Sequence, residues 1–161
     1  MPIQITATVD PGASSVEARN ERGQVVHLDT EPPEGEGSAP GPKETLLASL
    51  AGCTAMDVAS ILRKKRQVAR TYEIAVSGES AREHPRIFTA ISVEHRVSGE
   101  VEPEALRRSI ELSATRYCPV NAMLSAVARI EHSYLLTDAT GARHAAVVAV
   151  TGPDRVSRVV A

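Results

Sequence analysis

The chain has 161 residues and a net charge of −2, which predicts one globular domain without a strong field for nucleic acid or anionic membranes. Aromatic residues make up only 2% of the sequence, so we expect an aliphatic core and no stacking platform for single-stranded nucleic acid. The opening segment, MPIQITATVD, lacks the basic and apolar stretches of a secretory signal. We therefore expect a cytoplasmic protein with no nucleic-acid or membrane partner, in which a structural disulfide is a less favoured use of its two cysteines.

Three short strands are predicted at the start of the chain. Residues 3–9, 14–20 and 24–29 alternate apolar and polar side chains, and the turn-forming sequences DPG and ERG separate them. A polar loop, EPPEGEGSAPGP, follows at 31–42 and has no periodicity. Its last residue, Pro42, is well suited to the first position of a helix.

A long helix is predicted from Pro42 to about Gln67, where it ends after the basic sequence RKKR. The apolar run at 45–62 approaches the length of a membrane span. However, Asp57 lies inside this run, and a carboxylate is costly in lipid. We therefore expect a buried core helix rather than a membrane helix.

The rest of the chain predicts an α+β order of elements. The expected elements are paired strands at 71–80 and 86–97, helices at 103–115 and 119–128, and a strand at 130–137. The predicted domain covers residues 1–137. Residues 138–161 form a C-terminal extension, which is either an added hairpin or a loose appendage.

The predicted long helix carries a polar seam between two apolar stripes when its residues are projected at about 100° each. One stripe is small and the other bulky: Ala48, Ala51, Gly52, Ala55 and Ala59, against Leu46, Leu50, Val58 and Ile61. The seam consists of Ser49, Cys53, Asp57 and Ser60. Free cysteine is among the most buried residue types and is usually inert, so the helix alone favours packing over chemistry for Cys53.

The second cysteine, Cys118, lies in RYCPVNAML, directly before Pro119. This position predicts the start of a helix, where free N–H groups and the helix dipole stabilise a thiolate. Arg116 adds a positive charge two residues away. Cys118 is therefore either a reactive thiol or a residue that packs at a helix junction.

Three segments of the chain resemble the OsmC/Ohr family of peroxide-handling proteins: GPKETLLASLAGCTAMDVASILRKKRQ at 41–67, YCPVNAML at 117–124 and HPRIFTAISVEHRVSG at 84–99. The resemblance covers about residues 3–137. It implies the OsmC-like α+β fold, with antiparallel sheets around a long buried central helix in an intertwined homodimer. The family's small-residue stripe then has a role, since it lets two central helices approach closely.

The resemblance also implies a function, a peroxiredoxin-like peroxidase that needs no cofactor and serves oxidative-stress defence. Cys53 would be the peroxidatic cysteine, attacking a small organic hydroperoxide to give a sulfenic acid. Cys118 would resolve that acid as a disulfide. A small dithiol or a thiol protein would then reduce the disulfide.

Enzymes of the family hold the thiolate with an arginine from the N-terminal strands, tethered by a glutamate just after the helix-opening proline. Here Lys43 follows that proline, and Glu44 comes one place later. The resemblance therefore points to Glu44 and, among nearby arginines, Arg19. This pattern is closer to the less characterised OsmC-like branch than to the organic hydroperoxide resistance enzymes. Asp57, one helical turn from Cys53, disfavours a thiolate there.

The histidines show no metal-ligand spacing among themselves or with the cysteines, so we expect surface histidines and no metal site. They are His27, His84, His95, His132 and His144. The alternative function is a non-enzymatic dimeric binding module. Its interfacial apolar pocket would hold a small lipid-like or electrophilic ligand, with the cysteines inherited or sensory.

Overall fold

A computed structural model describes residues 2–153 and 158–159, which divide into two units between Leu46 and Leu47. The first unit is an antiparallel three-stranded sheet in the order β1-β2-β3. Its strands are β1 (Ile5–Asp10), β2 (Ser15–Asn20) and β3 (Val25–Leu28). All three lie within a residue or two of the segments that alternation predicted, because turn residues fix their ends.

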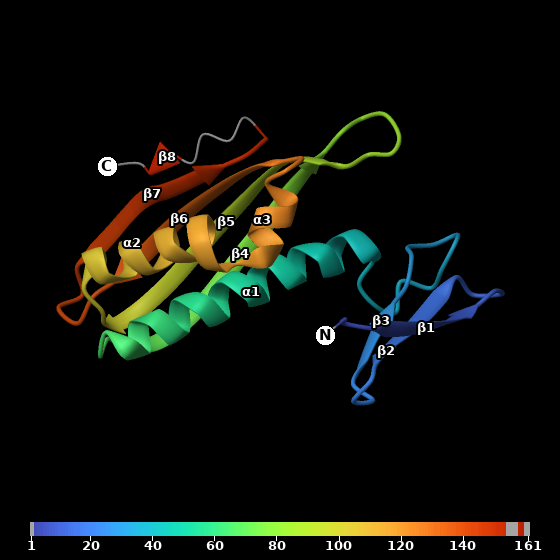
Figure 1. Cartoon of the computed structure of the whole chain (residues 1–161), viewed down its shortest axis with the longest axis horizontal. Helices are drawn as coiled ribbons and strands as arrows, with labels where there is room; N and C mark the ends of the chain where they lie inside the picture. Colours follow the sequence, from blue (N-terminus) through green and yellow to red (C-terminus); the bar gives the residue numbers. More distant parts are fainter. Residues whose placement is uncertain (1, 154–157, 160–161) are drawn as a thin grey trace. The chain divides into compact units, whose positions relative to one another are not determined.

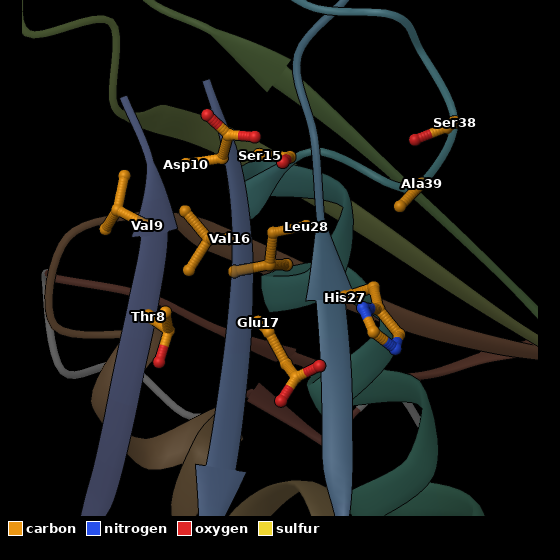
Figure 2. A pocket seen from close by; sticks show the side chains of 10 residues that line it. All are labelled: Thr8, Val9, Asp10, Ser15, Val16, Glu17, His27, Leu28, Ser38 and Ala39. Atoms are coloured by element: carbon orange, nitrogen blue, oxygen red, sulfur yellow. The ribbon is translucent and has the colours of Figure 1, made fainter. Parts of the chain in front are cut away.

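One face of this small sheet carries an open hollow of about 500 Å³ (Figure 2). A cross-strand row runs along it, because Val9 pairs with Val16 and Val16 pairs with Leu28. Val9 is 55% exposed, so this row is apolar surface that the described part of the chain leaves largely uncovered. Beyond the sheet, Asp29 ties down the following loop by accepting bonds from the Ser38 amide and hydroxyl, and these bonds hold the pKa of Asp29 below its usual range.

The long helix α1 (Pro42–Lys64) starts where Pro42 predicted. Glu44 reaches back one turn, and its carboxylate accepts the Gly41 N–H at 2.7 Å, which satisfies one of the free donors of the first turn. Arg66 adopts a left-handed conformation with φ 58°, and the chain leaves the helix there. Both ends of α1 are therefore defined by local interactions or backbone conformation.

The second unit is organised around a five-stranded sheet in the order β4-β5-β6-β7-β8. Its strands are β4 (Val68–Ser80), β5 (Phe88–Glu100), β6 (Arg129–Thr137), β7 (Arg143–Thr151) and β8 (Arg158–Val159). The expected antiparallel pairing holds except between β5 and β6, which run parallel. Parallel neighbours need a long crossover, and here the segment between the two strands supplies it.

The crossover contains three short helical pieces, α2 (Pro103–Leu112), a π-type turn (Ser113–Tyr117) and α3 (Pro119–Leu124). The predicted helices at 103–115 and 119–128 are therefore both present but shorter than expected. The π-type turn separates them, since the Cys118 amide bonds to the Ser113 carbonyl five residues back.

The core of this unit lies between one face of the sheet and the helices α1, α2 and α3 (Figure 1). Alternate residues of β5 point into it, and each fully buried Val, Leu or Ile side chain contributes roughly 1.5–3 kcal/mol. One cluster contains Cys118 and packs against Cys53: Leu50, Phe88, Ile91, Val93, Cys118, Ala128 and Ile130. The two cysteines therefore lie at the edge of an apolar core.

Helix α1 buries one face in the described chain, on which Leu50, Thr54, Val58 and Leu62 lie. The opposite side remains open: Met56 is 70% exposed, and a Cβ added to Gly52 would meet no atom within 4 Å. By length and composition α1 is also the one described helix that could cross a membrane. Its packing against the sheet agrees instead with the core helix that the sequence predicted.

Candidate functional site

The two cysteines meet in the second unit, although 65 residues separate them in the chain. Cys53 is half-buried on α1, and Cys118 is 3% exposed at the N-cap of α3. Their sulfurs lie 2.6 Å apart, and both cysteines are free. Close contact of the two thiols, which the family resemblance implied, is therefore present.

The contact between the sulfurs has a direction. The Cys118 thiol donates to the Cys53 sulfur, while the Asn121 amide donates to the Cys118 sulfur at 3.3 Å. Burial, and then the bond to Cys53, raise the pKa of Cys118 to about 12. Cys118 therefore holds its proton at neutral pH, and Cys53 is the sulfur that accepts.

This result corrects the expectation of a stabilised thiolate at Cys118. The helix-start amides of Val120 and Asn121 do lower its pKa, but burial in the apolar cluster outweighs them. Arg116 is exposed, and its guanidinium carbon lies 6.0 Å from the ring centre of Tyr117.

Asp57 extends the site by one helical turn from Cys53. One of its carboxylate oxygens lies within 4.8 Å of both sulfurs. The Ser113 hydroxyl lies 3.0 Å from both the Thr54 hydroxyl and an Asp57 oxygen, so the π-type turn is joined to α1 by side-chain bonds. The predicted seam is thus a real feature, and Cys53, Asp57 and Ser60 on it are all half-buried.

Arg19 and Glu44, the other two site residues implied by the resemblance, belong to the first unit. Arg19 pairs with the Glu17 carboxylate at 2.5 Å and donates to the Gly23 carbonyl, within and next to β2. Glu44 caps α1 through Gly41, as described above. Their part in the chemistry remains a prediction.

Two histidines contradict the expectation of surface positions. His95 on β5 and His132 on β6 are fully buried, because they fall in phase with the inward-facing apolar residues of their strands. Burial lowers the pKa of His132 to about 4 and, with the neighbouring His132, that of His95 to about 3. Both are neutral at pH 7. The stripes Ile91-Val93-His95-Val97 and Ile130-His132-Tyr134-Leu136 are the sequence signal that could have identified them.

A divalent metal could be held by Cys53, Asp57 and Cys118, whose ligand atoms lie within 4.8 Å of one another. Two thiolates and a carboxylate suit Zn²⁺, with a water as fourth ligand. Zinc keeps its thiolate ligands roughly 3.8 Å apart, so the sulfurs would have to separate by about 1 Å.

A hollow of about 580 Å³ lies beside Asp57 in the same unit. It combines apolar side chains with two lysines at the end of α1, and its lining consists of Asp57, Ser60, Ile61, Lys64, Lys65, Leu112 and Tyr117. It continues the face of α1 that carries Cys53 and has room for a small organic molecule.

Known proteins share both the sequence and the fold of this chain. Over 97 residues it is 41% identical to protein YhfA of Escherichia coli strain K12, which covers 60% of this chain and 72% of YhfA. A hypothetical protein from Aquifex aeolicus aligns with a TM-score of 0.76 at 25% identity, over 86% of this chain and 98% of its own. The organic hydroperoxide resistance protein OhrB of Bacillus subtilis shares the fold with a TM-score of 0.60 at 11% identity, over 83% and 98%.

The family described as OsmC-like protein matches residues 35–133, which include α1, both cysteines, the crossover, β5 and the first half of β6. These are the elements that build the dithiol site. The chain belongs to the OsmC-like protein family.

Proposed function

We propose that this protein reduces organic hydroperoxides through Cys53 and Cys118, in the cytoplasm, as part of the defence against oxidative stress. The observation that carries the proposal is the 2.6 Å contact in which the Cys118 thiol donates to the Cys53 sulfur. Cys53 is the more exposed of the two sulfurs, and the pKa of Cys118 is raised, so we assign Cys53 as the nucleophile of the pair.

The first step forms a bond between the Cys53 sulfur and the terminal oxygen of the hydroperoxide. The O–O bond breaks, an alcohol leaves after taking up a proton, and Cys53 becomes a sulfenic acid. In the second step the Cys118 sulfur attacks Cys53. The S–S bond forms, the S–O bond breaks, and the hydroxyl leaves as water with the Cys118 proton. A dithiol or thiol protein then returns two electrons and two protons.

The surroundings favour an organic substrate. Cys53 packs against the cluster around Leu50 and Phe88, and the hollow beside Asp57 offers Ile61, Leu112 and Tyr117 as apolar lining. An alkyl or aryl group gains from contact with such surfaces, whereas hydrogen peroxide does not.

We also propose that the protein acts as a homodimer. The side of α1 that carries Gly52 and Met56 is open in the described chain, and on the first unit the row Val9–Val16–Leu28 is exposed at Val9 and half-buried at the other two residues. Small residues on α1 allow close approach of a second helix. A partner subunit is also a source for the arginine that the family uses, with Arg19 and Glu44 as this chain's contribution.

The test is a single-turnover reaction with one equivalent of cumene hydroperoxide. We expect two thiols per chain to disappear and one cumyl alcohol to form, with a disulfide between Cys53 and Cys118 found by peptide mapping. Cys53→Ser should leave the hydroperoxide intact. Sedimentation at micromolar concentration checks the dimer separately.

The hollow of about 580 Å³ keeps one second function open, the binding of a small amphipathic ligand whose acidic group meets Lys64 and Lys65. Under that function the wild-type thiols would survive the hydroperoxide at every pH.

A further inference from the structure

The network behind Cys118 contains two buried histidine nitrogens that the dithiol chemistry does not use. His95 Nε2 and His132 Nδ1 have no hydrogen-bond partner among the described residues, although both side chains are fully buried. Buried polar atoms are almost always bonded to protein or to ordered water, so this pair requires an explanation.

Asn121 fixes the proton positions at one end of the network. Its side-chain amide donates to the Ala114 carbonyl at 2.7 Å and to the Thr151 hydroxyl at 3.3 Å, so its oxygen is the atom that faces His132. His132 Nε2 lies 2.9 Å from that oxygen and must donate to it. Because His132 is neutral, its Nδ1 carries a lone pair.

Tyr72 lies at the other end of the network. Burial, and then the charge of Asp57, raise the pKa of Tyr72, so its hydroxyl keeps its proton. That hydroxyl lies 2.7 Å from His95 Nδ1, and the tautomer of His95 decides which of the two atoms donates. With Tyr72 as the donor, the proton of neutral His95 is on Nε2, so one unpartnered nitrogen is a donor and the other an acceptor.

The two imidazole rings that carry these nitrogens are neighbours in the core. Their centres are 5.8 Å apart and their planes are tilted by 30°. A water needs at least two polar partners in a buried site, and this pair supplies one donor and one acceptor.

We propose that Tyr72, His95, one buried water, His132 and Asn121 form a one-way hydrogen-bond chain that positions the Cys118 thiol to donate to Cys53. Each donor points toward the dithiol: Tyr72 to His95, His95 through water to His132, and His132 to the Asn121 oxygen. The Asn121 backbone N–H then holds the Cys118 sulfur, and Cys118 donates to Cys53.

Asn121 links the histidines to Cys118 through its fixed position and carries no charge itself. Its side chain bonds to β6, the π-type turn and β7 through His132, Ala114 and Thr151, and these bonds hold its backbone N–H beside the Cys118 sulfur.

The inference rests on the proposed function only for its catalytic consequence, and alkylation of Cys53 tests it without any hydroperoxide. The experiment measures the rate at which iodoacetamide alkylates Cys53 between pH 6 and pH 10, in protein that retains Cys118. His132→Leu should move the midpoint of this profile upward by about one pH unit and slow alkylation at pH 7 by about tenfold.

Two milder variants keep the test decisive if His132→Leu does not fold. Tyr72→Phe removes only the first donor and should shift the midpoint in the same direction by a smaller amount. His132→Gln keeps a donor for Asn121 and should restore most of the wild-type profile. His84→Leu changes an exposed histidine and serves as the matched control, with no shift expected.

Nitrogen-15 NMR gives an independent readout, since it distinguishes the two neutral tautomers. Both His95 and His132 should carry their proton on Nε2 and remain neutral from pH 8 to pH 5. A proton on His132 Nδ1 would overturn the chain. So would unchanged alkylation profiles in folded Tyr72→Phe and His132→Leu, even if the wild type reduces hydroperoxide. A wild type that alkylates as expected but ignores hydroperoxide would instead contradict only the proposed function.

Discussion

Cys53 and Cys118 touch one another, yet their surroundings differ in almost every physical respect. Cys53 is half-buried in the middle of α1, near the carboxylate of Asp57, which lines an open hollow. Cys118 is buried, caps a short helix, and is backed by Asn121 and the neutral histidines. A dithiol with one accessible and one immobilised sulfur suits sequential roles, in which Cys53 reacts with the substrate first and Cys118 reacts in the following step.

The largest effect should come from the histidines on the Cys118 side. Their pKa values are lowered in the folded state, to about 3 for His95 and about 4 for His132, so the unfolded chain binds more protons below pH 6.5. The free energy of unfolding should therefore be highest above pH 6.5. It should fall by on the order of 5 kcal/mol as the pH drops toward 4.

Denaturant titrations at pH 7, 6, 5 and 4.5 measure this directly. The window between pH 6.5 and 5 is informative because most carboxylates still carry their charge there. A flat profile across that window would show that the two imidazoles bind protons equally in the folded and unfolded protein.

The next effect concerns Cys118 itself. Cys118→Ser should complete one round of hydroperoxide reduction and then stop, so steady-state turnover should fall by at least about 100-fold. Intact mass should show one added oxygen, and a sulfenic-acid probe should label Cys53. Continued turnover at the wild-type rate would mean that an external thiol resolves Cys53 directly.

Zinc binding should test whether Cys53, Cys118 and Asp57 can bind one metal ion together. One equivalent of Zn²⁺ should slow alkylation of both cysteines by about tenfold, and a chelator should restore the rate. Asp57→Asn should weaken this protection because it removes the only charged oxygen ligand of the set. Equal protection in wild type and Asp57→Asn would show that the carboxylate is not a ligand.

The smallest effect should come from Asp57, the charged residue near Cys53. Asp57→Asn removes a negative charge near both sulfurs while its amide oxygen can still accept from Ser113, so the first oxidation step should accelerate about three- to tenfold at pH 7. Asp10→Asn, on the first unit, is the matched control. A slower reaction would instead assign Asp57 a direct part in proton transfer.

The elements around the two cysteines were predictable because they depend on nearby residues in the sequence. Pro42 marks the start of α1, the period of the helix places Asp57 on the same seam as Cys53, and Pro119 places Cys118 at a helix start. These signals depend on residues within one or two turns. They predicted the order of strands and helices up to β6 to within a few residues, whereas β7 lies in the segment for which the sequence left a hairpin and a loose appendage open.

What depends on distant parts of the chain was not predictable. The parallel pairing of β5 with β6 and the π-type turn before Cys118 are set by how the crossover packs. The charge state of Cys118 follows from burial, which local sequence does not show. His95 and His132 were misassigned, although their alternation with buried aliphatic residues was visible, because histidine was taken to favour the surface.

The parallel pairing of β5 with β6 has a consequence for how the protein matures. During synthesis Cys53 leaves the ribosome long before Cys118, and the two sulfurs meet only after the non-local β5–β6 ladder has closed over the crossover. Until then Cys53 is a single thiol without its donor. We therefore expect the rate at which newly refolded chains gain a zinc-protectable or disulfide-forming thiol pair to follow the slow phase of sheet assembly, so that the dithiol reports on folding as well as on oxidants.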